Sequence, residues 1–244
     1  MSLSPPSLLL AGCGDIACRL AGLLQSDFRL TGLRRQPTHL PPFIEPLAAD
    51  LCDAASVARA LSGRSFDYVV VTLTPGERTE QRYRSVYVDG TRQLLATLGG
   101  QPRVLFVSST SVYAQDAGEA VDESSVASGS GFSGRCLREA EDLVWASGLP
   151  ASCIRFSGIY GPGRERLLRM VREGRVDPAS AAQWTNRIHA DDCAGVLAFL
   201  LARWQAGQAP APCYVASDSC PVQAATVWQW LASQLGVPDP LAGH

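Results

Sequence analysis

Short apolar segments alternate with longer segments of helical periodicity along this chain, and this alternation constrains the fold more than any other feature. The predicted strands are residues 7–11, 28–32, 44–49, 68–72, 103–108, 151–156 and 213–216. The predicted helices are residues 15–24, 56–61, 80–98, 137–145, 167–172, 191–203 and 224–235. Strands that alternate with helices are typical of a parallel sheet joined by crossover helices. The sequence therefore predicts an α/β fold with a doubly wound parallel sheet.

The pattern changes after Gly158, where a turn and a short helix replace the regular alternation. We therefore expect a sheet domain over residues 1–157 and a small C-terminal region over residues 158–244 that contributes to the substrate side. The last strand and helix of that region could also pack back on the sheet. Residues 115–134, rich in Ser, Gly, Asp and Glu, form the longest irregular stretch. Such a loop in a compact domain is usually a lid, a binding loop or disordered.

The charges are nearly balanced, and a formal net charge of −2 provides no basic field for nucleic acid or anionic lipid. No apolar run approaches the roughly 20 residues of a membrane span. All 21 cationic residues are arginine, so the chain contains no lysine. We therefore expect small-molecule partners, neither nucleic acid nor membrane, and chemistry that does not depend on lysine.

Eight cysteines are spread over the chain without a C-x-x-C pair, and Cys18, Cys153 and Cys193 lie within apolar runs. This distribution favours buried reduced thiols and hence a cytoplasmic protein. Leu10-Ala11-Gly12-Cys13 has the letters of a bacterial lipoprotein cleavage site. Because no Arg or Lys precedes it and its apolar segment is short, we expect no export.

A glycine turn, Gly12-x-Gly14-x-x-Ala17, lies between the first predicted strand and the first predicted helix. In a dinucleotide fingerprint the first glycine allows a tight turn and the second lets the backbone approach a pyrophosphate. A small third residue allows close helix–strand packing, and the helix N-terminus receives the pyrophosphate. The sequence therefore predicts a Rossmann-type site, with a plain structural turn as the alternative. Its turn residues are Gly12, Cys13, Gly14, Asp15, Ile16 and Ala17.

The end of the second strand indicates which dinucleotide is bound. NAD-binding proteins place an acid about twenty residues after the fingerprint, whereas this chain has Arg34 and Arg35 there. Guanidinium groups suit a 2′-phosphate, which favours NADP(H) over NAD(H); a solvated basic turn is the alternative. Asp50 could bind the adenine amino group or cap the following helix. The predicted cofactor contacts also include Leu51, Thr72, Leu73 and Thr74.

Three later segments carry a family resemblance. Residues 107–113, VSSTSVY, resemble the S-S-x-x-V-Y-G signature of extended short-chain dehydrogenases/reductases, which include sugar-nucleotide epimerases and dehydratases. Residues 155–164, RFSGIYGPGR, are similar to the R-x-x-x-x-Y-G-P-G-R segment of that family. Residues 186–192, NRIHADD, are similar to a later segment with arginine, histidine and aspartate. With the glycine turn, four segments match in the right order, which implies hydride transfer at nicotinamide C4.

The catalytic pair that this resemblance implies is absent. The family uses a tyrosine as general acid/base and a lysine four residues later, which holds the nicotinamide ribose and lowers the tyrosine pKa. Alignment on the Gly-Arg step and the downstream glutamate puts Ser133 and Leu137 at the two positions, and a shift by one residue puts Phe132 and Cys136 there. An aliphatic hydroxyl is a far weaker acid than a phenol, so the usual mechanism is excluded. The pattern from Ser133 onward, S-G-R-x-L-x-x-x-E, resembles an atypical YeeZ-like branch that also lacks the pair.

The resemblance places the predicted catalytic residues at the end of the fifth strand. Ser109 matches the residue that orients the substrate oxygen, and Ser111 and Tyr113 are nearby candidates. Tyr113 or Tyr160 could supply the missing phenol. The predicted substrate contacts are Tyr160, Arg164 and Arg187, because the family holds a sugar-nucleotide diphosphate on this side and arginine suits that task. Surface ion pairing is the alternative for both arginines.

His189, Asp191 and Asp192 lack metal-ligand spacing, and we interpret them as helix caps and loop contacts, with Asp191 or Asp192 as the N-cap. No metal site is predicted. Two functions stay open: an NADP(H)-binding epimerase, dehydratase or reductase with a non-standard active site, acting on a sugar nucleotide or related small molecule, or a non-catalytic NADP(H)-binding sensor or partner-binding module. The oligomeric state also stays open, with a homodimer as one alternative.

Overall fold

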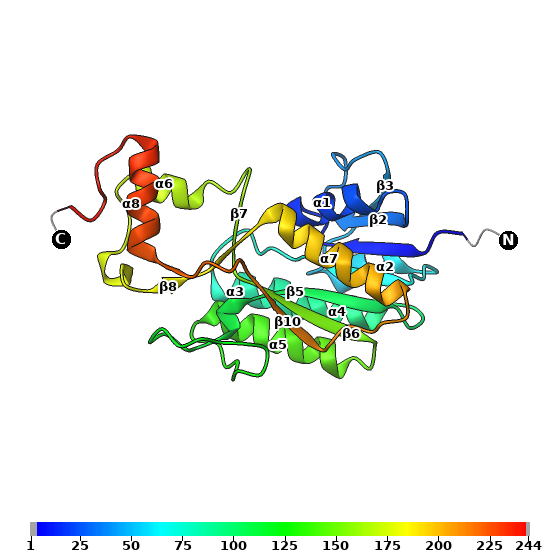
Figure 1. Cartoon of the computed structure of the whole chain (residues 1–244). Coiled ribbons are helices and arrows are strands. Elements are labelled where there is room, and N and C mark those ends of the chain that lie inside the picture. Colours follow the sequence, from blue (N-terminus) through cyan, green and yellow to red (C-terminus); the bar gives the residue numbers. More distant parts are fainter. Residues whose placement is uncertain (1–3, 243–244) are drawn as a thin grey trace.

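A computed structural model describes residues 4–242, and at its centre lies a seven-stranded sheet in which every neighbouring pair of strands is parallel (Figure 1). The strands are β1 Ser7–Ala11, β2 Arg29–Arg34, β3 Ile44–Ala48, β4 Tyr68–Val71, β5 Arg103–Ser109, β6 Ala151–Phe156 and β10 Cys213–Ala216. They lie in the order β10-β6-β5-β4-β1-β2-β3. This is the Rossmann order, with the switch point between β1 and β4. The predicted fold class is confirmed.

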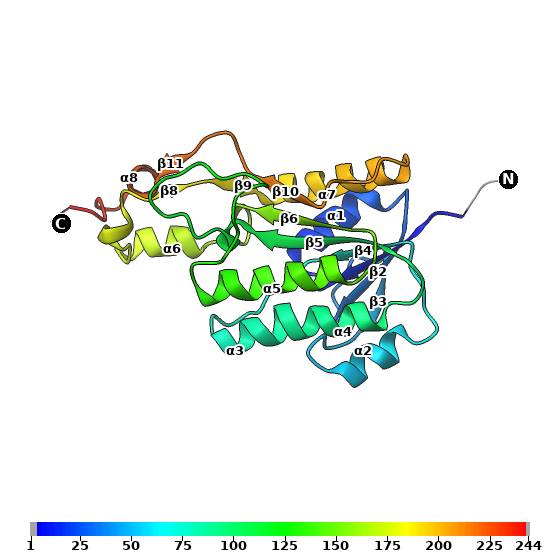
Figure 2. The same ribbon diagram turned by 90° about the horizontal axis from the view of Figure 1, so that it is seen from below.

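Helices cover both faces of the sheet (Figure 2). On one face lie α1 (Asp15–Leu24) and α7 (Ala190–Gln205), and on the other α2 (Ala54–Leu61), α4 (Gly90–Thr97) and α5 (Phe132–Ala146). Because side chains alternate along a strand, Leu8 and Leu10 of β1 enter the core beneath α1, whereas Leu9 enters the opposite core. All four residues of β4 are buried, as expected for a strand covered on both faces.

One long helix crosses the second face and carries a π-helical segment. It consists of α3 (Glu80–Tyr83), the π-helical segment η1 (Arg84–Asp89) and α4. The single helix predicted over residues 80–98 is confirmed, but the π-helical segment was not predicted. Such a segment shifts the phase of the side chains along the helix and is frequent at functional sites.

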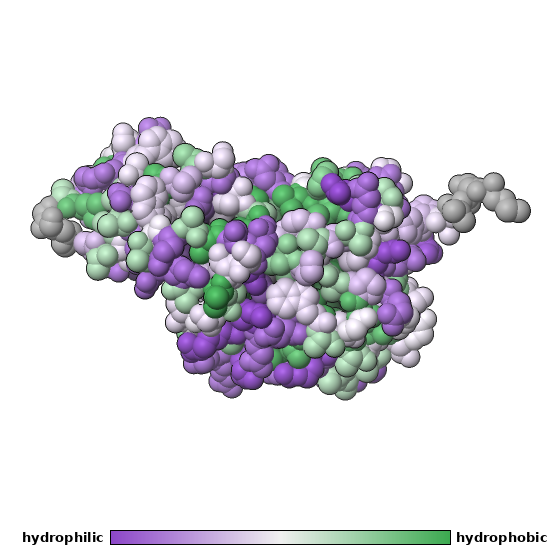
Figure 3. Space-filling view, turned by 60° about the horizontal axis from the view of Figure 1, so that its bottom comes forward, coloured by the Kyte–Doolittle hydropathy of each residue, from purple (hydrophilic) through white to green (hydrophobic). Residues whose placement is uncertain are grey.

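The chain leaves the sheet after β6 and enters a small lobe at the left of Figure 1. It returns to the sheet through α7 and β10 and then contributes two further elements to the lobe. The lobe comprises β7 (Gly158–Tyr160), α6 (Arg166–Arg172), the 3-10 helix η3 (Pro178–Ser180), β8 (Trp184–Thr185), β9 (Arg187–His189), β11 (Val222–Gln223) and α8 (Ala224–Leu235). It has a small core of its own, around Val171 and Trp228. The face in Figure 3 shows the lobe projecting from the sheet body, with apolar residues scattered among hydrophilic ones. The residues after 157 therefore contribute helices and strands both to the lobe and to the sheet domain.

Two predicted helix starts are wrong. Helix α5 begins at Phe132 and not at residue 137. Helix α7 is capped by His189, whose Nδ1 accepts a hydrogen bond from the Asp191 amide at 3.2 Å, and not by Asp191 or Asp192. The strands β7, β8, β9 and β11 were not predicted, because two or three residues are too few to show an alternating pattern.

The irregular stretch is confirmed over residues 115–131, which contain no helix or strand, but residues 132–134 belong to α5. This loop is nevertheless anchored. The Tyr113 hydroxyl donates to the Asp122 carbonyl at 2.7 Å, and Glu123 Oε1 accepts from the Val215 amide on the outer edge of β10 at 2.7 Å. The loop therefore satisfies an amide on the edge strand. Within residues 4–242, every helix is too short or too polar to cross a membrane.

Candidate functional site

The turn from β1 to α1 lies at the carboxyl end of the sheet. Gly12 has φ +82°, a left-handed conformation that favours glycine. A Cβ at this position would lie 2.9 Å from the Thr72 carbonyl oxygen. The Gly12 and Cys13 amides donate to the Leu33 carbonyl at 2.9 and 3.0 Å, and Thr72 Oγ1 donates to the Gly12 carbonyl at 2.9 Å. Both neighbouring strands therefore fix the turn, and position 12 requires glycine.

The N-terminus of α1 opens toward the cleft above the turn. Its N-cap is Gly14, which offers no side-chain hydrogen bond, and a Cβ there would meet nothing closer than the Gly12 carbonyl oxygen at 3.7 Å. Ala17 lies fully buried where α1 packs on the sheet. An open helix N-terminus with a positive dipole end suits a diphosphate. The geometry of Gly12, Gly14 and Ala17 therefore fits a bound dinucleotide.

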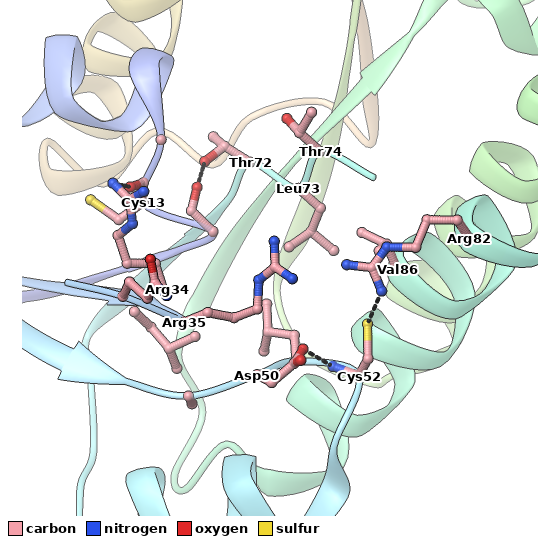
Figure 4. A pocket seen from close by; sticks show the side chains of 16 residues that line it. Cys13, Arg34, Arg35, Asp50, Cys52, Thr72, Leu73, Thr74, Arg82 and Val86 are labelled. Atoms are coloured by element: carbon pink, nitrogen blue, oxygen red, sulfur yellow. Dashed lines mark hydrogen bonds between the residues drawn. The ribbon is translucent and has the colours of Figure 1, made fainter. Parts of the chain in front are cut away.

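A cavity of about 390 Å³, here the first cavity, lies over the carboxyl ends of β1 to β4 (Figure 4). Every predicted cofactor residue except Asp15, Ile16 and Ala17 lines it. Asp15 and Ile16 line an adjoining cavity instead, and Ala17 belongs to the core. The topology therefore brings together residues that are far apart along the chain, from Gly12 to Val86.

Three guanidinium groups line the first cavity. Arg34 and Arg35 come from the end of β2, and Arg82 comes from α3 on the opposite side. Arg34 Nη1 donates to the Cys13 carbonyl at 3.3 Å, and Arg82 Nε donates to the Pro75 carbonyl at 3.0 Å. Figure 4 shows the Arg35 and Arg82 side chains directed toward one another across the cavity. Within residues 4–242, Arg35 makes no side-chain hydrogen bond or ion pair, so its donors face the open space.

Asp50 supplies the single carboxylate among the described residues that line the first cavity. Its Oδ1 accepts from the Cys52 amide at 2.9 Å. The following helix is capped by Asp53, which accepts from the Ala55 and Ser56 amides, so the interpretation of Asp50 as that cap is wrong. With three cations and one anion, the first cavity is locally positive although the chain is slightly acidic.

The adjoining cavity, here the second cavity, has a volume of about 680 Å³ and shares Gly14 and residues 72–74 with the first. It extends past the end of β5 to the turn after β7. Ser109 lines it, and the Ser109 Oγ accepts from the Ser111 amide at 3.2 Å. Leu137 of α5, which we expect at the position of the family's lysine, also lines this cavity and contributes an apolar side chain.

Polar atoms without partners also lie along the second cavity. The Ser108 hydroxyl and the Arg164 Nε are buried and make no hydrogen bond within residues 4–242. Arg164 Nη2 pairs with Asp15 Oδ2 at 3.1 Å, which places the guanidinium beside the first turn of α1. Buried polar groups are normally paired. An anionic ligand next to Arg164 would therefore satisfy its remaining donor.

Tyr113 and Ser111 do not face either cavity. The Tyr113 side chain is buried, and its hydroxyl donates to the Asp122 carbonyl and accepts from Arg155 Nη1 at 2.9 Å. Burial raises the pKa of this phenol above its usual range. Ser111 is exposed, and its carbonyl packs against Gly134. The prediction that Tyr113 supplies the missing phenol is therefore wrong.

Tyr160 and Arg187 also lie away from the second cavity. The Tyr160 ring packs edge-on against His189, with centroids 5.2 Å apart, along a separate groove on α7 and β10. Arg187 donates to Thr185 Oγ1 at 3.0 Å, and burial lowers its pKa. Of the three predicted substrate residues, the structure brings only Arg164 to the cleft. The described part of the chain holds no cluster of three or more metal-ligating side chains.

Sequence reasoning missed several residues of the cleft, among them Arg82 and Tyr87. Arg82 lines the first cavity, and Tyr87, of the π-helical segment, lines the second. Both lie on the helix after β4, which carries no recognised motif. Arg82 and Val86, four residues apart, face the same cavity, so helical periodicity was a usable signal for Arg82. The orientation of Tyr87 follows from the π-helical segment, which no sequence pattern indicated.

Comparisons with known proteins agree with this geometry. The model of the NAD dependent epimerase/dehydratase family matches residues 16–216. Protein YeeZ of Escherichia coli K12 is 32% identical over 144 residues, which are 57% of this chain and 48% of YeeZ, so the match spans about half the length of that relative. A 3-diazoavenalumate denitrifying reductase from a Streptomyces species is 28% identical and covers 96% of this chain and 83% of its own. A solved structure from Methylobacillus flagellatus, assigned to the NAD-dependent epimerases/dehydratases, is 34% identical with a TM-score of 0.82, covering 99% of this chain and 86% of its own.

Proposed function

The chain belongs to the NAD dependent epimerase/dehydratase family, and we propose that it binds NADP(H) across the two cavities and transfers hydride between this cofactor and a small molecule. The observation that carries the proposal is the set of three arginines around the first cavity. Two guanidinium groups directed into one space repel each other unless an anion lies between them. The 2′-phosphate of NADP(H) is such an anion, and guanidinium groups bind phosphate oxygens in pairs.

The rest of the cofactor would follow the ends of the strands. The diphosphate would lie over Gly14, on the open N-terminus of α1, with Arg164 beside it. The nicotinamide half would then enter the second cavity, past residues 72–74. When bound, the nicotinamide supplies a hydride donor or acceptor at its C4 atom.

The protein's own residues would orient the reactants in the second cavity. Ser109 Oγ, at the end of β5, can donate a hydrogen bond to a substrate oxygen, and Arg164 provides a cation at the same cavity for an anionic substrate. Such a substrate would be a sugar nucleotide or a related small molecule. Because Leu137 lies where the family has its lysine, no lysine is present to lower the pKa of a catalytic tyrosine. The chemistry of the site is therefore non-standard. One relative, which covers 96% of this chain, is named a 3-diazoavenalumate denitrifying reductase, and this supports reduction as the reaction.

We further propose a cytoplasmic location, in keeping with eight cysteines that are all free thiols in the structure. Burial raises the pKa of the Cys153 thiol well above its ordinary value, and that of Cys193 to about 12, which keeps both protonated. Protonated buried thiols are unreactive and serve as small apolar side chains.

Calorimetric titration with NADPH and NADH tests the cofactor proposal. We expect the wild type to bind NADPH at least about tenfold more tightly than NADH. Arg35→Ala and Arg82→Ala should each lose about tenfold in NADPH affinity, by removing charged hydrogen bonds, and leave NADH affinity unchanged. Arg92→Ala is the matched control, because Arg92 pairs with Asp89 at 2.9 Å outside both cavities. Equal or tighter binding of NADH by the wild type would contradict the preference.

The apolar Leu137 favours a second candidate function, a non-catalytic NADP(H)-binding sensor or partner-binding module. The absorbance of NADPH at the nicotinamide band, followed with a panel of sugar nucleotides and carbonyl compounds, separates the two functions. Turnover that falls at least about tenfold in Ser109→Ala supports the enzyme, since a lost transition-state hydrogen bond has that order of effect. NADPH binding without any turnover across the panel favours the sensor.

A further inference from the structure

The wall of the second cavity that lacks the lysine carries a phenol of its own. We propose that the Tyr87 hydroxyl accepts a hydrogen bond from a hydroxyl of the nicotinamide-side ribose of the bound cofactor and so positions it, a role that rests on the NADP(H) binding proposed above. Tyr87 and Leu137 line the same cavity, from neighbouring helices. The contact would replace the ribose hydrogen bond that the lysine would make.

The π-helical segment places Tyr87 at the junction of the two cavities. Val86 lines the first cavity and Tyr87, the next residue, lines the second. The Tyr87 hydroxyl lies 3.3 Å from the carbonyl oxygen of Leu73, and Leu73 is one of the residues that both cavities share. A dinucleotide that spans both cavities must pass this point, so the hydroxyl faces the middle of the proposed cofactor path.

The hydrogen bond to Leu73 leaves the phenol available to a ligand. Hydroxyl donors usually lie about 2.7–2.8 Å from their acceptors, and the contact here is longer. Within residues 4–242 the Tyr87 hydroxyl makes no other hydrogen bond. Burial raises its pKa well above the usual range of tyrosine, so the group stays protonated at neutral pH. A protonated phenol that cannot readily ionise is suited to hold a hydroxyl and not to transfer a proton, which makes Tyr87 a positioning residue.

Neighbouring rings fix the orientation of Tyr87. Its ring centroid lies 5.5 Å from that of Tyr83, and Tyr83 packs edge-on against Phe132 at 5.3 Å. Phe132 is the first residue of α5, so the rings connect the π-helical segment to the helix that carries Leu137. Because packing already restricts the side chain, little further conformational entropy is lost when the hydroxyl binds a ligand.

Calorimetry with Tyr87→Phe, NADPH and adenosine 2′,5′-bisphosphate tests this role. The bisphosphate resembles the half of the cofactor assigned to the first cavity, so it should not reach Tyr87. We expect Tyr87→Phe to bind NADPH about five- to tenfold more weakly, the loss of one hydrogen bond, and to bind the bisphosphate as tightly as the wild type. Tyr83→Phe is the matched control and should bind both ligands like the wild type, because Tyr83 lines neither cavity.

Three outcomes would overturn the assignment. Unchanged NADPH affinity in Tyr87→Phe would show that a hydrogen bond with Tyr87 does not contribute to the free energy of cofactor binding. Equal weakening of both ligands in that variant shows that Tyr87 supports the fold of the cleft and not the ribose. A wild type that binds neither ligand refutes the proposed function together with this role, and so differs from the first two outcomes.

Discussion

Tyr113 shows how a residue within a recognised motif can serve the fold. Its hydroxyl accepts from Arg155, whose guanidinium forms two hydrogen bonds of 2.9 and 2.7 Å with the Glu141 carboxylate. Arg155 is 3% exposed and Glu141 is fully buried. The phenol therefore completes a buried polar network between the segment after β5, strand β6 and helix α5. This network accounts for the arginine that begins the segment at residues 155–164.

Removing the negative charge from this network should destabilise the protein strongly. Glu141→Gln leaves the buried Arg155 guanidinium without a counter-charge, and we expect a loss of about 3–5 kcal/mol in the free energy of unfolding. Glu139→Gln is the matched control in the same helix, since Glu139 pairs with Arg84 at the surface at 2.9 Å and should cost at most about 1 kcal/mol. Urea unfolding followed by circular dichroism measures both. Similar losses in the free energy of unfolding in the two variants would contradict the claim that the buried ion pair matters more than the surface pair.

The beginning of α5 depends on a close approach between elements. Gly134 lies in the first turn of this helix, and a Cβ there would be 2.1 Å from the carbonyl oxygen of Ser111. The segment after β5 and the helix can only pack this closely because position 134 has no side chain. The glycines in residues 129–134 suggested a loop, whereas this packing accounts for the glycine at position 134 within a helix.

The same substitution should therefore have opposite effects in two helices. Gly134→Ala should lower the free energy of unfolding by about 1–3 kcal/mol, through overpacking against Ser111. Gly22→Ala, in α1, should raise it by up to about 1 kcal/mol, because nothing lies within 4 Å of the added Cβ and alanine favours helix. Thermal or urea unfolding of the two variants measures this difference. An unchanged or more stable Gly134→Ala would contradict the close packing.

Elements with strong periodicity were predictable, and those shaped by contacts were not. The bounds of β1, β6, β10, α1 and α8 agree with the prediction, because a buried strand and an amphipathic helix each leave a regular apolar pattern. The glycine turn was predictable as well, since a tight turn requires particular residue types, and Arg34 and Arg35 line the first cavity with it. Tyr87 and Arg82 were missed, because they reach the cavities only through the packing of their helix on the sheet, and a sequence pattern does not show this packing.

At the scale of the whole molecule, the cleft lies between the sheet and the lobe. The first cavity is lined by residues no later than Val86, so it is formed by the sheet and the helix after β4 without the lobe. The second cavity also takes residues from the segment that enters the lobe, among them Gly158 and Arg164. The Arg164–Asp15 ion pair connects this segment to α1, whereas β7 pairs with β9 in a separate two-stranded sheet. Cofactor binding at the first cavity should therefore depend little on the lobe.

This division predicts that the lobe can unfold by itself. Trp228 is 6% exposed and lies in the separate core of the lobe, so Trp228→Ala should cost about 3–5 kcal/mol there. We expect faster amide hydrogen exchange in α6 and α8, unchanged exchange in β1 to β6, and unchanged affinity for adenosine 2′,5′-bisphosphate. Trp230→Ala, in the same helix, is the matched control, because Trp230 is 60% exposed and its loss should leave exchange as in the wild type. If hydrogen exchange in the sheet rose as much as exchange in the lobe, the two would unfold as one cooperative unit. A change that destabilises the lobe would then also destabilise the proposed cofactor site.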